Sequence, residues 1–247
     1  LEDFTYRRCG AWGCHLRNCD GVEIRRVTCF NHVNNTNDGI DIESRNVLIE
    51  DCDIDSMDDA LCFKSESEPS FAIENAIVFK TESDVDFAVT NVLVRNCRLA
   101  SCCNALKFGT GSYCDFRNVT VENCTFARPN GNFRFNRAKW TGEKGLLTGI
   151  AGMALEVVDG GRMENVTIRN VTIDGYLTPV FIRLGNRHAP QSGKETYLRN
   201  VLLENVSAMC ADSRLASSIT GVPGLKVRDV TLRNCEFVFP GGGTAED

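Results

Sequence analysis

The sequence is poor in histidine, has no long hydrophobic run and carries no surplus of basic charge. With 3 histidines and no Cys-x-x-Cys pair, a zinc site is not expected, and we predict no metal and no cofactor. No stretch is long and apolar enough to span a membrane, and none resembles a signal peptide. The net charge of -6 argues against a nucleic-acid partner, because phosphate binding requires a basic face.

Helical periodicity is also absent over any useful length, which argues against an α-helical fold. The 247 residues are enough to bury a large core, and we expect one monomeric domain over residues 1–247. Because the chain begins at Leu1 and not at Met, we expect that an N-terminal segment carrying an address is missing.

The 13 cysteines are not spaced like those of a small disulfide-rich domain. Five of them follow Asn or Asp and precede a polar residue and then an apolar one: Cys19, Cys52, Cys97, Cys124 and Cys235. Because they recur at one place in a repeat, we expect buried thiols stacked in a core.

One strand-like motif recurs along the whole chain, as in Asn46-Val-Leu-Ile-Glu-Asp-Cys. Its copies begin at Gly21, Asn46, Asn91, Asn118, Asn165, Asn200 and Asp229. Each alternates apolar and polar residues, is rich in β-branched side chains and ends in Asn or Asp, where the backbone can bend. Repetition at this frequency indicates a solenoid.

A second short strand precedes each copy of the motif. These strands begin at Gly13, Gly39, Ala60, Ala105, Ala154, Pro179 and, less clearly, Ser218. A period of two places their second and fourth residues inside and their third and fifth residues outside. Two or three strands per coil predict an all-β parallel β-helix of about seven coils. Insertions at 66–90, 128–150 and 185–198 are expected to wall a groove.

Aligning the second strands predicts two columns of outward, exposed residues. The first is His15, Asp41, Cys62, Lys107, Glu156 and Phe181, and the second is Arg17, Glu43, Lys64, Gly109, Val158 and Arg183. Stacked strands lie about 4.8 Å apart, so four aspartates on two successive coils should converge. They are Asp38, Asp41, Asp58 and Asp59. Like charges this close raise one another's pKa, which suits an acid/base pair or a cation site.

The segments 37–42 (Asn-Asp-Gly-Ile-Asp-Ile) and 58–65 (Asp-Asp-Ala-Leu-Cys-Phe-Lys-Ser) resemble the polygalacturonase family, glycoside hydrolase family 28. That family consists of pectin-degrading right-handed β-helices in which such segments supply three catalytic aspartates. The resemblance implies that Asp58 is the general acid and that Asp38 and Asp59 hold and activate water in an inverting hydrolysis. It also implies a polysaccharide or oligosaccharide substrate and a secreted or periplasmic location.

The chain departs from that family at two substrate-binding segments. The family's Gly-His-Gly falls on residues 103–105, so Asn104 replaces the histidine, and its Arg-Ile-Lys falls on residues 156–158, which begin with Glu156. Other predicted substrate-binding residues are Asp41, Lys64, Lys107, Arg183 and Arg187. Lys107 and Arg183, with Arg187 nearby, are expected to bind a uronate carboxylate; alternatively, Glu156 hydrogen-bonds a neutral sugar. We therefore expect a modified pectin, such as rhamnogalacturonan or an oligogalacturonide end.

Two other functions fit the same residues. A polysaccharide lyase would use the acidic cluster to bind Ca²⁺ and a nearby Lys or Arg as the base. A non-catalytic glycan-binding solenoid would explain the missing histidine and the missing Arg-Ile-Lys segment.

Overall fold

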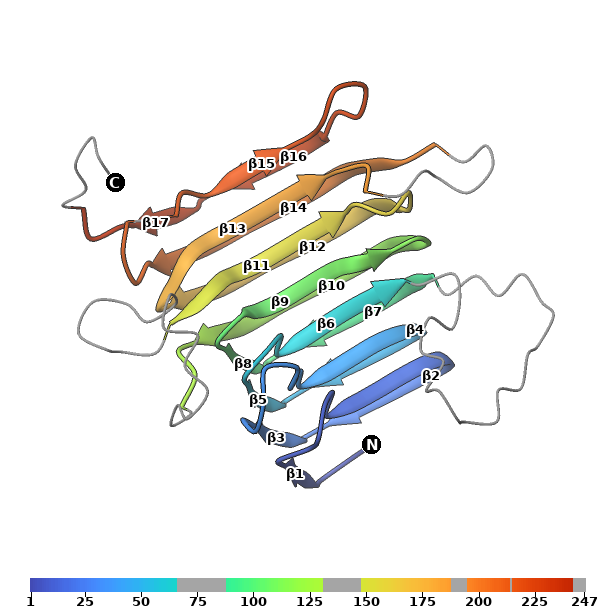
Figure 1. The fold of residues 1–247 in the computed structure, drawn as a ribbon, viewed down its shortest axis with the longest axis vertical. Helices are drawn as coiled ribbons and strands as arrows, with labels where there is room; N and C mark the ends of the chain where they lie inside the picture. Colours follow the sequence, from blue (N-terminus) through green and yellow to red (C-terminus); the bar gives the residue numbers. More distant parts are fainter. Residues whose placement is uncertain (66–87, 131–147, 188–194, 214, 242–247) are drawn as a thin grey trace.

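The structure is a computed structural model that describes residues 1–65, 88–130, 148–187, 195–213 and 215–241. The described residues form 17 strands and no helix, and every pairing between these strands is parallel (Figure 1). The strands are β1 (Thr5–Arg7), β2 (Cys14–Arg25), β3 (Thr28–Asn31), β4 (Ile40–Glu50), β5 (Asp53–Ser56), β6 (Leu61–Ser65), β7 (Val89–Arg95), β8 (Arg98–Ser101), β9 (Asn104–Ser112), β10 (Asp115–Ala127), β11 (Gly149–Val157), β12 (Arg162–Asp174), β13 (Tyr176–Leu184), β14 (Tyr197–Met209), β15 (Ser218–Thr220), β16 (Arg228–Arg233) and β17 (Glu236–Val238). The predicted all-β parallel β-helix is confirmed.

Each coil contributes strands to three faces of the β-helix. The first face holds the beginnings of β2 and β4, followed by β6, β9, β11, β13 and β15. The second face holds the recurring motif, and the third holds β3, β5, β8 and the ends of the long strands. Among described residues no helix is long and apolar enough to cross a membrane.

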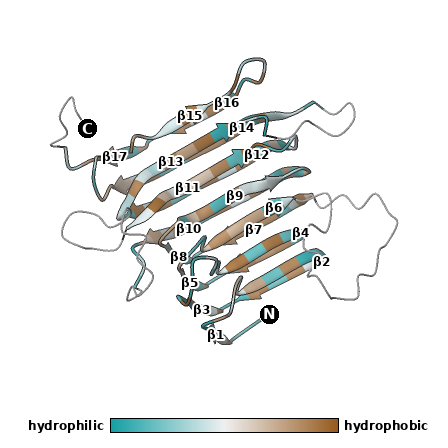
Figure 2. Ribbon diagram, viewed as in Figure 1, coloured by the Kyte–Doolittle hydropathy of each residue, from teal (hydrophilic) through white to brown (hydrophobic). Residues whose placement is uncertain are grey.

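The recurring motif stacks in register on the second face. Its first apolar position forms one column: Val22, Val47, Val92, Val119, Val166, Val201 and Val230. On the first face, Leu61, Phe63, Leu106 and Phe108 are all fully buried, as the period of two predicted. The alternation of apolar and polar residues is visible along the strands in Figure 2. Ile219 stacks in register with the buried Ile182 but is 45% exposed, because β15 is the last described strand of this face.

Asparagine corners connect the second face to its neighbours. The first Asn of the motif and the Asn near its end both take a positive φ, for example 56° at Asn118 and 54° at Asn123. Asparagine tolerates this left-handed conformation better than most residues. Its amide also donates a hydrogen bond to the preceding coil: Asn118 Nδ2 donates to Asn91 Oδ1 at 3.1 Å, and Asn165 Nδ2 donates to Asn118 Oδ1 at 3.0 Å. The predicted corners are confirmed.

The predicted cysteine stack is confirmed in part. Cys52, Cys97 and Cys124 are buried at one corner, and Cys235 is half-buried on the last described coil. Cys19 was wrongly placed in this stack, because it lies where the pairing of β2 and β4 shifts between residues 17 and 20. All 13 cysteines lie among the described residues, and no disulfide joins them.

One register prediction on the first face is wrong. Lys107 pairs with Ala154 and not with Glu156, and Glu156 pairs with Arg183. Because the side-chain period is two, a slip of two residues keeps the same residues inside and leaves no trace in the pattern. Glu156 therefore lies in the second outward column, that of Arg183, and Ala154 takes its place in the column of Lys107. The bulk of the three predicted insertions, residues 66–87, 131–147 and 188–194, lies outside the described residues.

The corner geometry predicts the effect of substitutions at Asn118. Asn118→Ala should lower the free energy of unfolding by about 1–2 kcal/mol, because alanine pays the steric cost of the left-handed conformation. Asn118→Gly avoids that cost and should lose less. Urea unfolding midpoints of the two variants and the parent provide the measurement. Equal midpoints for the Ala and Gly variants would contradict the assignment of strain to this corner.

Candidate active site

The aspartate segment begins at a turn held by a fully buried asparagine. Asn37 Nδ2 donates to the carbonyls of Cys9 and Ala11, and Asn37 Oδ1 accepts from the backbone N–H of Val33. At Gly39 a Cβ would collide with Ile54 and with a carbonyl of the next coil. Glycine is therefore required for the two coils to approach, and this approach places Asp38 beside the next coil.

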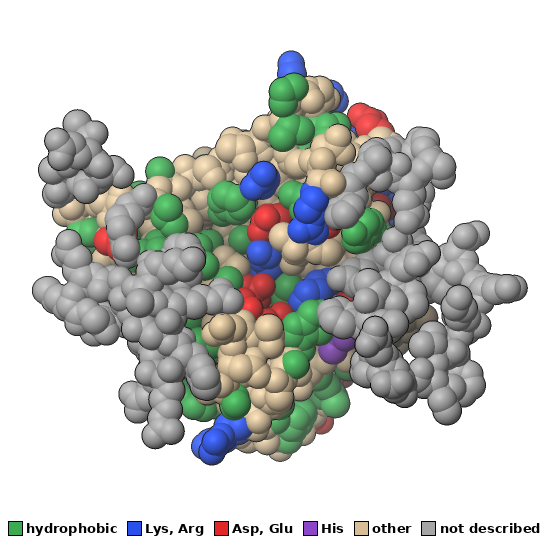
Figure 3. All heavy atoms as spheres, in the orientation of Figure 1, with side chains coloured by type: hydrophobic (Ala, Val, Ile, Leu, Met, Phe, Trp, Pro, Cys, Tyr) green, Lys and Arg blue, Asp and Glu red, His purple; other side chains and the backbone are tan. Residues whose placement is uncertain are grey.

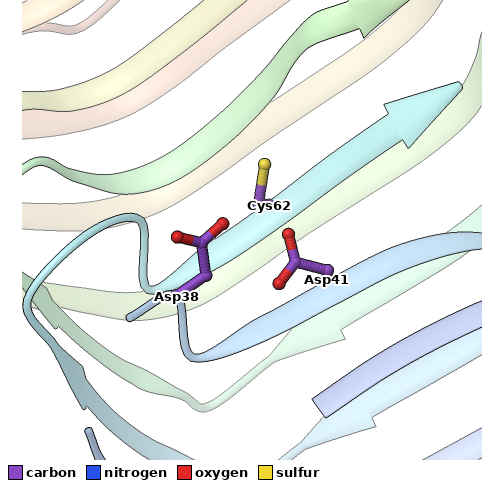
Figure 4. A group of neighbouring side chains, drawn as sticks. All are labelled: Asp38, Asp41 and Cys62. Atoms are coloured by element: carbon purple, nitrogen blue, oxygen red, sulfur yellow. The ribbon is translucent and has the colours of Figure 1, made fainter. Parts of the chain in front are cut away.

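Asp38, Asp41 and Lys64 form the first charged cluster. Lys64 Nζ lies 3.1 Å from Asp38 Oδ2 and also forms an ion pair with Asp41 Oδ1. The same ammonium lies 3.9 Å from the centroid of the Trp12 ring, a cation–π contact. Cys62, on β6, also belongs to this cluster. One carboxylate oxygen of Asp38, one of Asp41 and the sulfur of Cys62 lie within 4.8 Å of one another (Figure 4).

Burial raises the pKa of both carboxyl groups in this cluster. The pKa of Asp38 rises to about 8, mainly through burial and then through the negative charge of Asp41, while Lys64 opposes the rise. The pKa of Asp41 rises to about 6, because burial outweighs the effect of Lys64. Burial acts to lower the pKa of Lys64, but the charges around it outweigh burial and hold its pKa above the ordinary value. Near neutral pH, Asp38 therefore holds a proton and Lys64 is charged.

Asp58 and Asp59 form the second cluster, between β5 and β6. Their carboxylates and the Cys103 sulfur lie within 4.8 Å of one another. Asn104 Nδ2 donates to Asp59 Oδ1 at 2.6 Å, so the residue that replaces the family's histidine contacts a predicted catalytic carboxylate. The charge of Asp59 also contributes to the raised pKa of Asp38, which brings the two clusters into electrostatic contact.

Lys107 and Glu156 form an ion pair on the coils that follow. Lys107 Nζ lies 2.7 Å from Glu156 Oε1, and both side chains are nearly buried. Burial acts to lower the pKa of Lys107, but the charges of Asp59 and Glu156 outweigh it and raise the pKa. The structure thus brings Lys107 close to Asp59. Figure 3 shows acidic and basic side chains gathered near the centre of the face in view.

The two predicted arginines lie at the far end of the first face. Arg183 is exposed and borders a cavity with Glu156 and Arg187. Arg187 already binds a carboxylate, since its Nε and Nη2 donate to the two oxygens of Asp159 at 2.7 Å each. Asp159 is 1% exposed. A substrate carboxylate at Arg187 would have to share the guanidinium with Asp159, whereas Arg183 is open to solvent.

The prediction that the outward columns are exposed is wrong near the aspartates. Asp41, Glu43 and Cys62 point away from the core, yet each is at most 1% exposed. His15 covers Glu43, with Nε2 2.8 Å from its Oε1. Trp12 covers Lys64. Trp12 and Glu43 were not predicted as site residues. The position of Trp12, three residues before the outward His15, could have indicated Trp12.

The described residues fit Ca²⁺ poorly. In the first cluster the Lys64 ammonium already occupies the space between Asp38 and Asp41, where a cation would bind. In the second cluster the third possible ligand is the Cys103 thiol, a soft ligand, whereas Ca²⁺ takes oxygen ligands. Neither cluster offers the all-oxygen set that a Ca²⁺-dependent lyase would need.

Comparison with known proteins supports the fold. Residues 1–175 match the family described as the right-handed β-helix region. The chain belongs to this right-handed β-helix family. The β-helix also resembles the solved structure of a family 28 exopolygalacturonase from Yersinia enterocolitica, with a TM-score of 0.51 and 14% sequence identity. This match covers 98% of the chain but 44% of that enzyme, and at this identity it shows a shared fold alone. No curated protein matches the chain.

The raised pKa of Asp38 predicts a stability that depends on pH. An unfolded aspartate has a pKa of about 3.9, so the folded β-helix binds the proton more tightly. The stabilisation that comes from protonated Asp38 is complete below about pH 4 and is lost as pH rises toward about 8. Asp38→Asn, which keeps the shape of the protonated acid, should reduce the fall in unfolding free energy between pH 5 and pH 8.5 by about 4 kcal/mol.

Urea unfolding at both pH values measures this effect. Asp229→Asn is the control, because Asp229 lies at a corner of the second face where other coils carry Asn. An unchanged pH dependence in Asp38→Asn would contradict a buried, protonated Asp38.

Proposed function

We propose that the chain is a glycoside hydrolase that cleaves a pectin-related acidic polysaccharide by an inverting mechanism. The observation that supports this most strongly is the convergence of two carboxyl clusters on adjacent coils, one of which holds a proton near neutral pH. Hydrolysis of a glycosidic bond requires an acid, a base and a positioned water, and four carboxyl groups in unlike environments can supply these roles.

The roles proposed for the aspartates are those that the resemblance of segments 37–42 and 58–65 implies. Asp58 is less buried than the other three aspartates, and we assign to it protonation of the leaving glycosidic oxygen. Asp59, bonded by Asn104 and close to Lys107, activates the attacking water. Asp38 is protonated near neutral pH, so it orients that water by a hydrogen bond rather than taking its proton. Lys64 and Asp41 position Asp38.

The acidic substrate is inferred from the exposed cation at the end of the groove. Arg183 is open to solvent and can bind a uronate carboxylate, whereas Lys107 is already paired with Glu156. The named activity of the similar exopolygalacturonase is compatible with this substrate class, although the chain spans 44% of that enzyme. A secreted or periplasmic location stays a prediction.

A glycan-binding β-helix without catalysis is the second candidate. The ion pair of Lys64 with Asp41 and the proton held by Asp38 are the observations that favour it, because they leave neither carboxyl group of the first cluster available as a base. Binding of oligosaccharide without turnover would support this candidate.

Hydrolysis is tested by incubating the protein with rhamnogalacturonan and polygalacturonan oligosaccharides. New reducing ends without ultraviolet absorbance are expected, and proton NMR should show an inverted anomeric configuration in the first product. Asp58→Asn and Asp59→Asn should each lower the rate about 10²–10⁴-fold. Asp229→Asn should leave it unchanged. Absorbance that disappears with a chelator would indicate a lyase instead.

The role of Asp38 makes a separate prediction. If Asp38 acts in its protonated form, Asp38→Asn should keep more activity than Asp59→Asn, and parent activity should fall as pH rises through about 8. The measurement is the pH dependence of kcat/KM for both variants and the parent. Activity that rises through the same range would assign Asp38 the role of the base.

A further inference from the structure

A cavity of about 390 Å³ lies beside the second carboxyl cluster. The lining residues that carry the argument come from β9, β11 and β13: Asn104, Lys107, Ala151, Ala154, Glu156 and Phe181. We call it the apolar cavity. Because Asn104 also donates to Asp59, a sugar in this cavity would lie next to the carboxylates assigned to hydrolysis. Its volume is within the range of small-molecule sites.

The walls of the apolar cavity carry little available charge. Lys107 and Glu156 are its charged residues, and they neutralise each other at 2.7 Å. Ala151, Ala154 and Phe181 supply apolar surface on the face of β11 and β13 that points away from the core. A uronate carboxylate in this cavity would find no unpaired cation among the lining residues. A methyl group, in contrast, would be stabilised by burial against the apolar side chains.

A second cavity of about 550 Å³ adjoins the first along the strand direction, and Glu156 lines both. Phe181 of the apolar cavity and Arg183 of the second cavity are two residues apart on β13, so their side chains lie on the same face, about 7 Å apart. The exposed guanidinium of Arg183 gives the second cavity an available positive charge. Neighbouring units of one bound glycan would therefore meet an apolar surface in the first cavity and a positive charge in the second.

We propose that the apolar cavity binds a sugar unit that carries a methyl group, next to a uronate held by Arg183. This names the substrate class within the proposed function and rests on it for the assumption that the ligand is a glycan. The methyl group has two chemical sources, a 6-deoxy sugar or an O-acetyl substituent. Phe181 offers an aromatic surface for the apolar side of the sugar ring, and Glu156 accepts hydrogen bonds from sugar hydroxyls at the boundary between the cavities.

Equilibrium binding tests the assignment without relying on turnover. Isothermal titration calorimetry on Asp58→Asn and on the parent would use two matched pairs of ligands. The first pair is the disaccharide of L-rhamnose and D-galacturonate and its analogue with L-mannose, which differs by a hydroxyl on C6. The second pair is digalacturonate with and without one O-acetyl group. At least one methyl-bearing ligand should bind about tenfold or more tightly than its partner.

Substitution should remove this preference. Ala154→Leu fills the apolar cavity and should bring the two members of the preferred pair to equal affinity. Phe181→Ala is the second variant, and it should weaken the methyl-bearing ligand more than its partner. Ser207→Leu, at an exposed position of β14 away from the first face, is the matched control and should keep the preference. Arg183→Gln should weaken all four ligands, because all four carry a uronate.

Equal affinities within both pairs, or no binding of any ligand, would overturn the proposal. So would a methyl preference that survives both Ala154→Leu and Phe181→Ala. A methyl preference in a protein that does not hydrolyse the ligands would overturn the proposed hydrolysis and leave the binding site supported. Hydrolysis that depends on Asp58 without a methyl preference would do the reverse.

Discussion

Parallel stacking of coils at a spacing of about 4.8 Å is the constraint on which the rest of the structure depends. Each residue lies directly above its counterpart, so a position that is apolar in one coil must be apolar in the next. The column of seven valines on the second face and the buried Leu and Phe pairs on the first face follow from this rule. The asparagine corners follow as well, because the chain must bend at the same place in every coil.

The same constraint creates the electrostatics of the candidate site. Outward side chains on successive coils are as close as inward ones, so charges in a column must alternate or be neutralised. Lys64 is placed between Asp38 and Asp41, and Lys107 lies between Asp59 and Glu156. Removing one partner from such buried pairs is strongly destabilising, because the other charge remains without compensation. The site therefore combines acidic groups with raised pKa values and cations that fix their positions.

Much of the fold was predictable because its signal is repeated. The strands, corners and core columns follow from periodicity, and the resemblance of segments 37–42 and 58–65 brought attention to the four aspartates that the structure places on adjacent coils. The register at Glu156 was not predictable, since a slip of two residues preserves the pattern. The burial of Asp41 and Lys64 was not predictable either, because it depends on Trp12 and on ion pairs across coils. Roles in binding and catalysis stay predictions.

The asparagine corners bear on how the protein can be produced. Several of these asparagines lie in Asn-x-Thr or Asn-x-Ser sequences, the acceptor pattern for N-linked glycosylation, as at Asn118, Asn165 and Asn170. The glycan would attach to Nδ2, the same atom that donates to the neighbouring coil. Modification and coil-to-coil bonding thus compete for one nitrogen. Once the coils have stacked, the amides are engaged, whereas a host that glycosylates the chain before it folds would interrupt the ladder at its corners.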